Sequence, residues 1–367
     1  MVIPMSSYKS RPIVLVAGGS GGHVFPAIAL AEYAHHHALP VILITDARGS
    51  RFIEKDRSFF SHIEIVAPAS LRTSFSTYHK IRRLYKQYNP NCILGFGGIT
   101  TVLPLLMARF YGIGCAIHQS DAVLGRANRL LAPLMDGVFV GHGLECYAKH
   151  ISSNKPHKWR TIGTPVRHAF TSVQPHTDIQ TPLKILILGG SQGAKIWSTL
   201  LPDALSMLDR EHQLAIQICH QSPKDDISFL TDRYRALSLG SFRVAPFFPN
   251  MAELLSWSHV VFSRAGASTL AELAHCHRPS FLVPYPLALD NHQYFNARSH
   301  SHHYRAWMST ESELNASELA SKIMGWLDKP DELLYGEKQT KILPPVNACS
   351  ELLSFCTSTT ADSFYRD

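Results

Sequence analysis

A buried strand that runs into a glycine-rich turn occurs twice in this chain, and this repeat constrains the fold more than any other feature. Val-Leu-Val-Ala leads into Gly-Gly-Ser-Gly-Gly at residues 14–22, and Ile-Leu-Ile-Leu leads into Gly-Gly-Ser-Gln-Gly at residues 185–193, an offset of 171 residues. In both halves short apolar runs alternate with amphipathic stretches, which is typical of a parallel sheet with helices on both faces. The sequence therefore predicts an α/β protein of two Rossmann-like, doubly wound parallel-sheet domains that face each other across a cleft.

The apolar runs also predict the individual elements. We expect strands at 13–17, 41–45, 63–67, 92–95, 115–118 and 138–140, then at 185–188, 214–219, 242–245, 260–263 and 280–283. Helices are expected at 26–37, 78–88, 102–111 and 126–135, the first of them starting at Pro26. Few apolar residues and two prolines in Thr171–Pro182 favour a linker there. The predicted boundaries are 11–165, a linker region 166–182, 183–340, and a C-terminal tail or helix 341–367.

Composition excludes several classes of protein. With 45% hydrophobic and 17% charged residues the chain is expected to fold into packed domains. A net charge of +7 permits an anionic partner, but no zinc spacing or basic recognition helix points to nucleic acid. No apolar run reaches the roughly 18 residues of a membrane span, and no signal peptide precedes Arg11, so we expect a soluble or peripheral protein. Seven cysteines without a Cys-x-x-Cys pair indicate free thiols in a reducing cytoplasm.

The first glycine run, Gly18–Gly22, is followed directly by His23. Glycines let backbone amides approach phosphate or sugar oxygens, and the start of a helix attracts anions. The same helix start disfavours a charged imidazole, so His23 can be a neutral general base; a plain capping histidine is the simpler alternative. Asp46, at the end of the second strand, would suit nicotinamide dinucleotide binding, but Val24 stands where that fingerprint needs its third glycine.

Three segments of the second half suit a nucleotide. The run 189–193 offers amides and a hydroxyl at a second helix start. In Arg264–Glu272 the carboxylate of Glu272 can accept hydrogen bonds from two ribose hydroxyls, or it can simply complement its own helix dipole. The polar run Asp290–Asn296 includes Gln293, which can read sugar hydroxyls. Because Asp-x-Asp is absent from the sequence, we expect no metal and no other cofactor, with amides, helix dipoles and arginine neutralising a diphosphate.

Seven motifs in one order resemble the GT-B glycosyltransferases of family 28, and among them the enzymes that add N-acetylglucosamine to lipid I in peptidoglycan synthesis. The resemblance runs from about Arg11 to about Leu327. The motifs are Gly18–Pro26, Gly95–Gly98, His118–Asp121, Gly163–Arg167, Gly189–Ala194, Arg264–Glu272 and Asp290–Asn296.

The resemblance implies an inverting transfer from UDP-N-acetylglucosamine to the 4-hydroxyl of the muramyl sugar of lipid I, which gives lipid II. It implies that His23 is the base, that Ser191 contacts the diphosphate, Phe248 the uracil, Glu272 the ribose and Gln293 the sugar. The remaining donor residues that it implies are Ser20, Gly21, Gly22, Asp121, Arg167, Ala267, Ser268, Thr269, Leu270 and Ala271. The acceptor's diphosphate would lie against Gly18, Gly19, Gly97 and Gly98.

Two motifs depart from the family pattern. Gln119 and Asp121 replace a Glu and an Asn, and the Gly-Gly-Tyr-Val-Ser turn reads Gly98-Ile99-Thr100-Thr101 after Gly97. The first departure favours a degenerate donor-binding protein without chemistry as one alternative. A GT-B enzyme that glycosylates diacylglycerol is a second, and a nicotinamide-dependent oxidoreductase is a third.

The stretch Leu71–Asn89 interleaves basic and aromatic residues, which is typical of a surface that binds anionic lipid, although a solvated helix would look similar. With the resemblance, it predicts a peripheral protein on the cytoplasmic face of the bacterial inner membrane. Its predicted partners are UDP-N-acetylglucosamine, lipid I, an anionic membrane and proteins of cell-wall synthesis.

Overall fold

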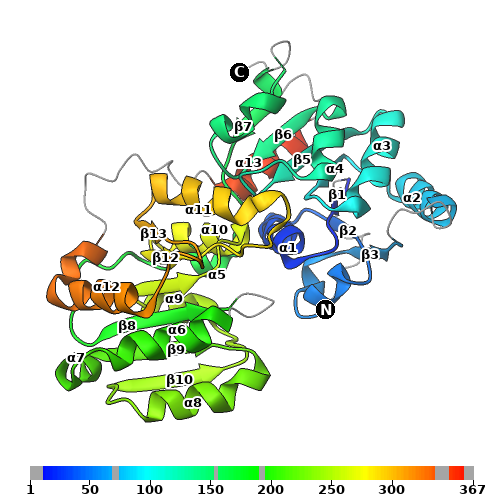
Figure 1. Ribbon diagram of the computed structural model, residues 1–367. Coiled ribbons are helices and arrows are strands. Elements are labelled where there is room, and N and C mark those ends of the chain that lie inside the picture. Colours follow the sequence, from blue (N-terminus) through cyan, green and yellow to red (C-terminus); the bar gives the residue numbers. More distant parts are fainter. Residues whose placement is uncertain (1–10, 68–73, 153–155, 190–194, 335–346, 359–367) are drawn as a thin grey trace. The chain divides into compact units, whose positions relative to one another are not determined.

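Each half of the chain forms one parallel sheet with helices on both of its faces (Figure 1). The computed structural model describes residues 11–67, 74–152, 156–189, 195–334 and 347–358. Contacts divide the chain into two units, Met1–His168 with Pro345–Asp367, and Ala169–Pro344. The prediction of two parallel-sheet α/β domains is confirmed.

The first sheet has seven strands in the order β3-β2-β1-β4-β5-β6-β7. Their bounds are β1 (Ile13–Val16), β2 (Val41–Thr45), β3 (His62–Ile65), β4 (Cys92–Gly95), β5 (Gly114–Gln119), β6 (Gly137–Val140) and β7 (Trp159–Thr161). The helices are α1 (Gly21–His36), α2 (Ser74–Tyr88), α3 (Val102–Phe110) and α4 (Arg126–Leu131), followed in the chain by α5 (His168–Thr171). Short 3-10 helices lie at Gly49–Phe52, Arg57–Phe59, Ile99–Thr101, Ala132–Leu134, Leu144–His150 and Pro156–Lys158.

Strand β1 shows why its sequence is a continuous apolar run. Ile13 and Leu15 belong to a core shared with α1, whereas Val14 and Val16 belong to a second core shared with α2 and α3. A strand that is buried on both faces needs apolar residues at every position. The parallel sheet is therefore specified by the strand sequence itself.

The first helix, α1, starts earlier than the sequence predicts. It begins at Gly21 instead of Pro26, because the carbonyl of Ser20 accepts hydrogen bonds from the backbone N–H groups of His23 and Val24. Pro26 lies inside the helix and is buried. The second half of the glycine run is consequently the first turn of the helix, and His23 lies within that turn.

The last described helix, α13 (Ala348–Thr357), returns to the first unit. Leu352, Leu353 and Phe355 are buried in the core that also contains Ile13 and Leu94. The ring of Phe355 packs edge-on against Phe139, with 5.3 Å between their centroids. The chain thus covers one face of its first sheet with a helix from its far end.

The second sheet has six strands in the order β10-β9-β8-β11-β12-β13. Their bounds are β8 (Leu183–Leu188), β9 (Ile216–Gln221), β10 (Ser241–Ala245), β11 (Val260–Ser263), β12 (Ser280–Leu282) and β13 (Ala306–Met308). The helices are α6 (Lys195–Ser206), α7 (Arg210–Leu214), α8 (Ile227–Arg235), α9 (Met251–Trp257), α10 (Ala267–His275), α11 (His292–His303) and α12 (Ala316–Asp328). Short 3-10 helices lie at Lys224–Asp226, Leu289–Asn291 and Pro330–Leu333.

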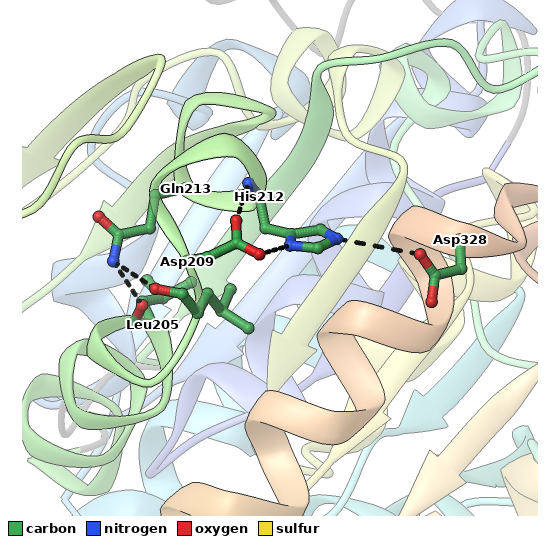
Figure 2. A network of polar contacts seen from close by, with 6 residues as sticks. Leu205, Asp209, His212, Gln213 and Asp328 are labelled. Atoms are coloured by element: carbon green, nitrogen blue, oxygen red, sulfur yellow. Dashed lines mark hydrogen bonds and ion pairs between the residues drawn. The ribbon is translucent and has the colours of Figure 1, made fainter.

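Polar side chains fix the turn between α6 and α7 (Figure 2). The carboxylate of Asp209 accepts a hydrogen bond from the backbone N–H of His212, and its second oxygen lies 2.8 Å from the Nδ1 of that residue. The Nε2 of His212 lies 3.9 Å from the Oδ1 of Asp328 at the end of α12. The amide of Gln213 donates to the carbonyls of Leu205 and Leu208. The Asp209 carboxylate thereby satisfies a backbone N–H group at the start of α7, and Gln213 adds hydrogen bonds to carbonyls at the end of α6.

The buried side chain of Arg278 forms hydrogen bonds with the segment through which the chain enters the second unit. Its guanidinium donates to the carbonyl of Gln174 at 2.8 Å and to that of Cys276 at 2.9 Å. Residues within the predicted linker Thr171–Pro182 are thus attached to the second unit.

We predict that Leu352→Ala loosens the first unit. The side chain of Leu352 is fully buried under the sheet, and truncation of such a leucine costs about 2–5 kcal/mol. Hydrogen exchange at the amides of β4 should therefore become faster. Ser354→Ala changes an exposed residue of the same helix and should leave exchange unchanged; equal protection in both variants would contradict the packing of α13.

Candidate active site

The two glycine turns of the first unit lie side by side. β1 and β4 are adjacent parallel strands, with Val16 opposite Gly95. Gly18 and Gly19 follow β1, and Gly97 and Gly98 follow β4, so both turns are at the same carboxyl edge of the sheet. This is the edge at which doubly wound sheets bind their ligands.

The ring of His23 has a defined hydrogen-bond partner in this edge. Its Nδ1 lies 3.0 Å from the carbonyl oxygen of Gly18 and 3.4 Å from the hydroxyl of Ser20. A carbonyl oxygen can only accept, so Nδ1 carries the hydrogen and Nε2 of the neutral ring keeps its lone pair. The half-buried imidazole is thus arranged to accept a proton at Nε2.

Gly97 and Gly98 leave room for this ring. Their φ angles are +106° and +83°, in the region that favours glycine. A methyl group on Gly97 would lie 3.0 Å from the Cδ2 and Nε2 of His23, and one on Gly98 would lie 3.0 Å from the carbonyl oxygen of Gly18. The packing of His23 therefore requires Gly97, and the close approach of the Gly18 backbone requires Gly98, whether or not either glycine contacts an acceptor.

Asp46 is a buried part of the loop structure. Its carboxylate accepts hydrogen bonds from the N–H groups of Arg48 and Gly49, at 3.0 and 2.8 Å, and from the Thr100 hydroxyl at 2.8 Å. Burial raises its pKa, but these hydrogen bonds and one from Gly19 outweigh burial and lower the pKa overall. With 2% of its surface exposed, Asp46 does not present a carboxylate to a ribose. The residue that favoured a nicotinamide-dependent oxidoreductase is therefore not available to bind that cofactor.

Gln119 shapes its own loop. Its side-chain oxygen accepts hydrogen bonds from the N–H of Gly125 and the amide of Asn128, both at 2.9 Å. Asp121 is half-buried, and its backbone carbonyl accepts a hydrogen bond of 2.7 Å from the hydroxyl of Tyr147. Gln119, which replaces a Glu of the family pattern, therefore stabilises the backbone of this loop.

Arg167 is half-buried within the first unit. Burial raises the pKa of Asp56, and the positive charge of Arg167 opposes that shift. The guanidinium thus acts electrostatically on a carboxylate of its own unit.

In the second unit, Arg264 anchors the loops at the carboxyl ends of β11 and β12. Its guanidinium donates to the carbonyls of Val283 and Pro284, at 3.2 and 3.3 Å, and forms an ion pair with Glu311. It also lies 5.5 Å from the centroid of the Tyr285 ring. This arginine therefore organises the edge where α10 begins.

The predicted nucleotide residues occupy the first two turns of α10. Ala267 and Leu270 are buried, whereas Ser268, Thr269, Ala271 and Glu272 are half-buried. The hydroxyl oxygen of Ser268 is buried and has no hydrogen-bond partner among the described residues. Ser191, predicted to contact the diphosphate, lies outside the described residues.

Gln293 and Phe248 have different surroundings. The side-chain oxygen of Gln293 accepts a hydrogen bond of 2.9 Å from the N–H of Tyr285, which orients its amide at the start of α11. The ring of Phe248 is buried, and the guanidinium of Arg243 lies 5.1 Å from its centroid. The neighbouring Phe247, which the sequence argument did not single out, is 60% exposed.

Among the described residues, no three His, Cys, Asp or Glu side chains are grouped so as to hold a metal ion. Within the same parts of the chain, no helix combines the length and apolar character needed to cross a bilayer.

Both halves match sequence profiles of one family. Residues 13–140 match the glycosyltransferase family 28 N-terminal domain, and residues 184–348 match the glycosyltransferase family 28 C-terminal domain. The chain belongs to glycosyltransferase family 28.

Relatives within family 28 are similar over most of their length. The chain is 35% identical, over 335 residues and 88% of each chain, to the UDP-N-acetylglucosamine–N-acetylmuramyl-(pentapeptide) pyrophosphoryl-undecaprenol N-acetylglucosamine transferase of Rhizobium rhizogenes. It is 36% identical, over 89% of its length and 88% of the relative's, to the protein of the same name from Bartonella bacilliformis.

Solved structures share the fold. The crystal structure of MurG from Acinetobacter baumannii has a TM-score of 0.72 and 24% identity, covering 93% of this chain and 95% of that one. A UDP-GlcNAc 2-epimerase from Neisseria meningitidis bound to UDP-GlcNAc has a TM-score of 0.66 and 12% identity, covering 94% and 99%. With both family 28 domains present, the predicted GT-B fold is confirmed.

We predict that this family 28 chain loses stability on mild acidification. Burial lowers the pKa of His118 to about 4 and that of His220 to about 3, against an unfolded value of 6.5. Below pH 6.5 the unfolded chain therefore binds protons that the folded chain does not, and stability falls until the pH reaches the folded pKa values. The expected slope is at most about 1.4 kcal/mol per pH unit for each ring.

Thermal midpoints between pH 7 and pH 4.5 measure this effect. His118→Gln cannot titrate but can still donate to the carbonyl of Gly163, which lies 2.9 Å from the ring of His118. This variant should show a shallower decline than the unmodified chain. Parallel curves would mean that His118 does not contribute.

Proposed function

We propose that this chain transfers N-acetylglucosamine from UDP-N-acetylglucosamine to the 4-hydroxyl of the N-acetylmuramyl sugar of lipid I, giving lipid II, with inversion at the anomeric carbon. The observation that carries the proposal is 35% identity over 88% of both chains to a transferase named for this donor and acceptor. The match is not confined to a nucleotide-binding half, because both family 28 domains are present. That extent favours this reaction over glycosylation of diacylglycerol.

The proposed chemistry uses the free Nε2 of His23. Nε2 takes the proton of the 4-hydroxyl, the oxygen attacks the anomeric carbon, and the bond between that carbon and the diphosphate breaks to release UDP. The hydrogen bond from Nδ1 to the carbonyl of Gly18 supports this role, because it orients the ring, leaves Nε2 free to accept the proton, and persists when the ring becomes an imidazolium. Gly18, Gly19, Gly97 and Gly98 are proposed to lie along the acceptor's diphosphate.

The donor is proposed to bind at the carboxyl edge of the second sheet. The amides at the start of α10 would stabilise the leaving diphosphate together with Ser191. Glu272 would accept hydrogen bonds from the ribose, and Gln293 would read the sugar. Since the Phe248 ring is buried, we assign the uracil contact to the backbone of Phe248 and the exposed side chain of Phe247. UDP-N-acetylglucosamine enters as a substrate, and no cofactor is part of the proposal. The remaining proposed donor contacts are Ser20, Gly21, Gly22, Asp121 and Arg167.

Three neighbouring helices are proposed to bind the membrane. Phe75 on α2, Phe110 on α3 and Leu130 on α4 are 75%, 85% and 60% exposed, and α3 contacts both other helices. The basic residues of these helices are Lys80, Arg82, Arg83, Lys86, Arg109, Arg126 and Arg129. Exposed apolar side chains on helices that also carry basic residues suit an anionic bilayer. We propose peripheral attachment to the cytoplasmic face of the bacterial inner membrane, where cell-wall synthesis proteins are the expected partners.

The reaction is tested by incubating the purified chain with labelled UDP-N-acetylglucosamine and a short-chain lipid I analogue. The label should appear in the disaccharide product only when lipid I is present. Transfer to diacylglycerol under the same conditions, with none to lipid I, would instead support the other lipid transferase.

We predict that His23→Ala lowers turnover roughly 100-fold or more, because a general base contributes about that factor. Affinity for UDP, measured by calorimetry, should stay near that of the unmodified chain. His302→Ala, which removes an exposed histidine near the end of α11, is the matched control. Undiminished turnover in His23→Ala would remove this residue as the base.

We predict that the double variant Phe75→Ser, Phe110→Ser binds anionic vesicles at least roughly tenfold more weakly, since two large rings no longer enter the bilayer. Sedimentation with phosphatidylglycerol vesicles measures the binding. Phe229→Ser removes a ring that is 51% exposed on the second unit and should bind like the unmodified chain. Equal losses in both variants would argue against a specific membrane face.

A further inference from the structure

The glycine turn that contains Gly18, whose carbonyl is the hydrogen-bond partner of His23, packs against two buried side chains. Asp46 follows β2, and Thr100 lies in the 3-10 helix after β4. The Thr100 hydroxyl donates to the Oδ2 of Asp46 at 2.8 Å, while Oδ1 accepts from the N–H groups of Arg48 and Gly49. One carboxylate therefore joins the loops that follow two different strands.

Gly18 packs directly against this pair. A methyl group at Gly18 would lie 2.5 Å from the hydroxyl oxygen of Thr100 and 2.7 Å from the Oδ2 of Asp46. The neighbouring Gly19 also donates its N–H to the carboxylate of Asp46. The position of the Gly18 peptide is thus fixed by contact with Thr100 and by hydrogen bonding to Asp46.

The same peptide carries the acceptor for the imidazole. The carbonyl oxygen of Gly18 lies 3.0 Å from the Nδ1 of His23. In water a neutral imidazole can carry its proton on either nitrogen, and the hydrogen bond that it makes decides which. A displaced Gly18 carbonyl would therefore release both the orientation of the ring and the choice of tautomer.

We propose that Asp46 and Thr100 are positioning residues for His23: they hold the Gly18 carbonyl where it keeps the imidazole proton on Nδ1 and leaves Nε2 free to act as the base. This inference rests on the proposed role of His23. Neither side chain is part of the proposed contact with substrate, so both act through the backbone of the glycine turn.

The chain offers a closely matched control. Thr45 immediately precedes Asp46 and is fully buried, but its hydroxyl has no hydrogen-bond partner among the described residues. Thr45→Val and Thr100→Val therefore make the same chemical change in the same part of the core. Only the second removes a hydrogen bond to Asp46.

The first experiment compares steady-state kinetics of Thr100→Val, Thr100→Ser and Thr45→Val. In Thr100→Val, kcat should fall roughly tenfold or more, because small misplacements of a reacting group are costly. The KM for UDP-N-acetylglucosamine should change by less than about twofold if donor binding is untouched. Thr100→Ser restores the hydroxyl and should recover most of kcat, while Thr45→Val should resemble the unmodified chain. Equal kcat values in Thr100→Val and Thr45→Val would overturn the inference.

The second experiment reads the tautomer directly and needs no lipid substrate. Long-range proton–nitrogen spectra report which ring nitrogen is protonated, and His23→Gln identifies the signals of His23. The unmodified chain should show the proton on Nδ1, and Thr100→Val should show a substantial Nε2-protonated population. An unchanged tautomer would refute positioning through Gly18, whatever the kinetics.

Asp46→Asn keeps the inference testable if Thr100→Val folds poorly. It replaces one acceptor oxygen with a donor, and the same loss of kcat and of the Nδ1 tautomer is expected. Wild-type kcat and tautomer in this variant would contradict the proposal. If the unmodified chain transfers no sugar to lipid I, the proposed function fails, but the spectra still decide whether this pair positions His23.

Discussion

The chemistry proposed for the first unit depends on the hydrogen bond between His23 and the Gly18 carbonyl. In hydrolytic triads a carboxylate orients the histidine, whereas here the partner is a neutral backbone oxygen. The proposed base is therefore positioned by the path of the main chain, and that path needs glycine at positions 18 and 97. The absence of a side chain at Gly97, in the turn after β4, leaves room for the imidazole. Its absence at Gly18 leaves room for the side chains of Thr100 and Asp46. The glycines are a packing requirement of the histidine, apart from the phosphate contact proposed for them.

Much of the fold could be predicted because its strands are buried on both faces. The central strands are continuous apolar runs, and their order along the chain indicates a parallel sheet. The edge strands β7 and β13 were missed, since three residues such as Trp159-Arg160-Thr161 carry no clear pattern. The placement of α13 could not be predicted either. Its amphipathic sequence requires a sheet to cover, but only long-range packing decides that it covers the first.

Site residues could be predicted where a residue type has few structural or functional roles at such a position. Repeated glycines after a buried strand, followed by a histidine, indicate a ligand-binding turn, and the structure joins the two turns of the first unit at one sheet edge. Side-chain orientations that depend on the backbone path could not be predicted. Asp46 resembles a ribose-binding acid in sequence, yet it turns inward to loop amides. Phe248 is predicted to contact the uracil, yet its ring is buried and the side chain of its neighbour Phe247 is exposed. Sequence position alone does not distinguish these orientations.

The same distinction resolves the departure from the family pattern at residues 98–101. Thr100 donates to buried Asp46, and the Thr101 hydroxyl donates to the carbonyl of Gly98 at 2.7 Å. Both threonines therefore stabilise the turn from inside, whereas the side chain of Ile99 is 51% exposed. Of the three positions, only Ile99 has a side chain that can meet a ligand without rearrangement of the loop. If the acceptor binds at this turn as proposed, direct side-chain contact with it comes from Ile99, whereas Thr100 and Thr101 act on the backbone of the loops.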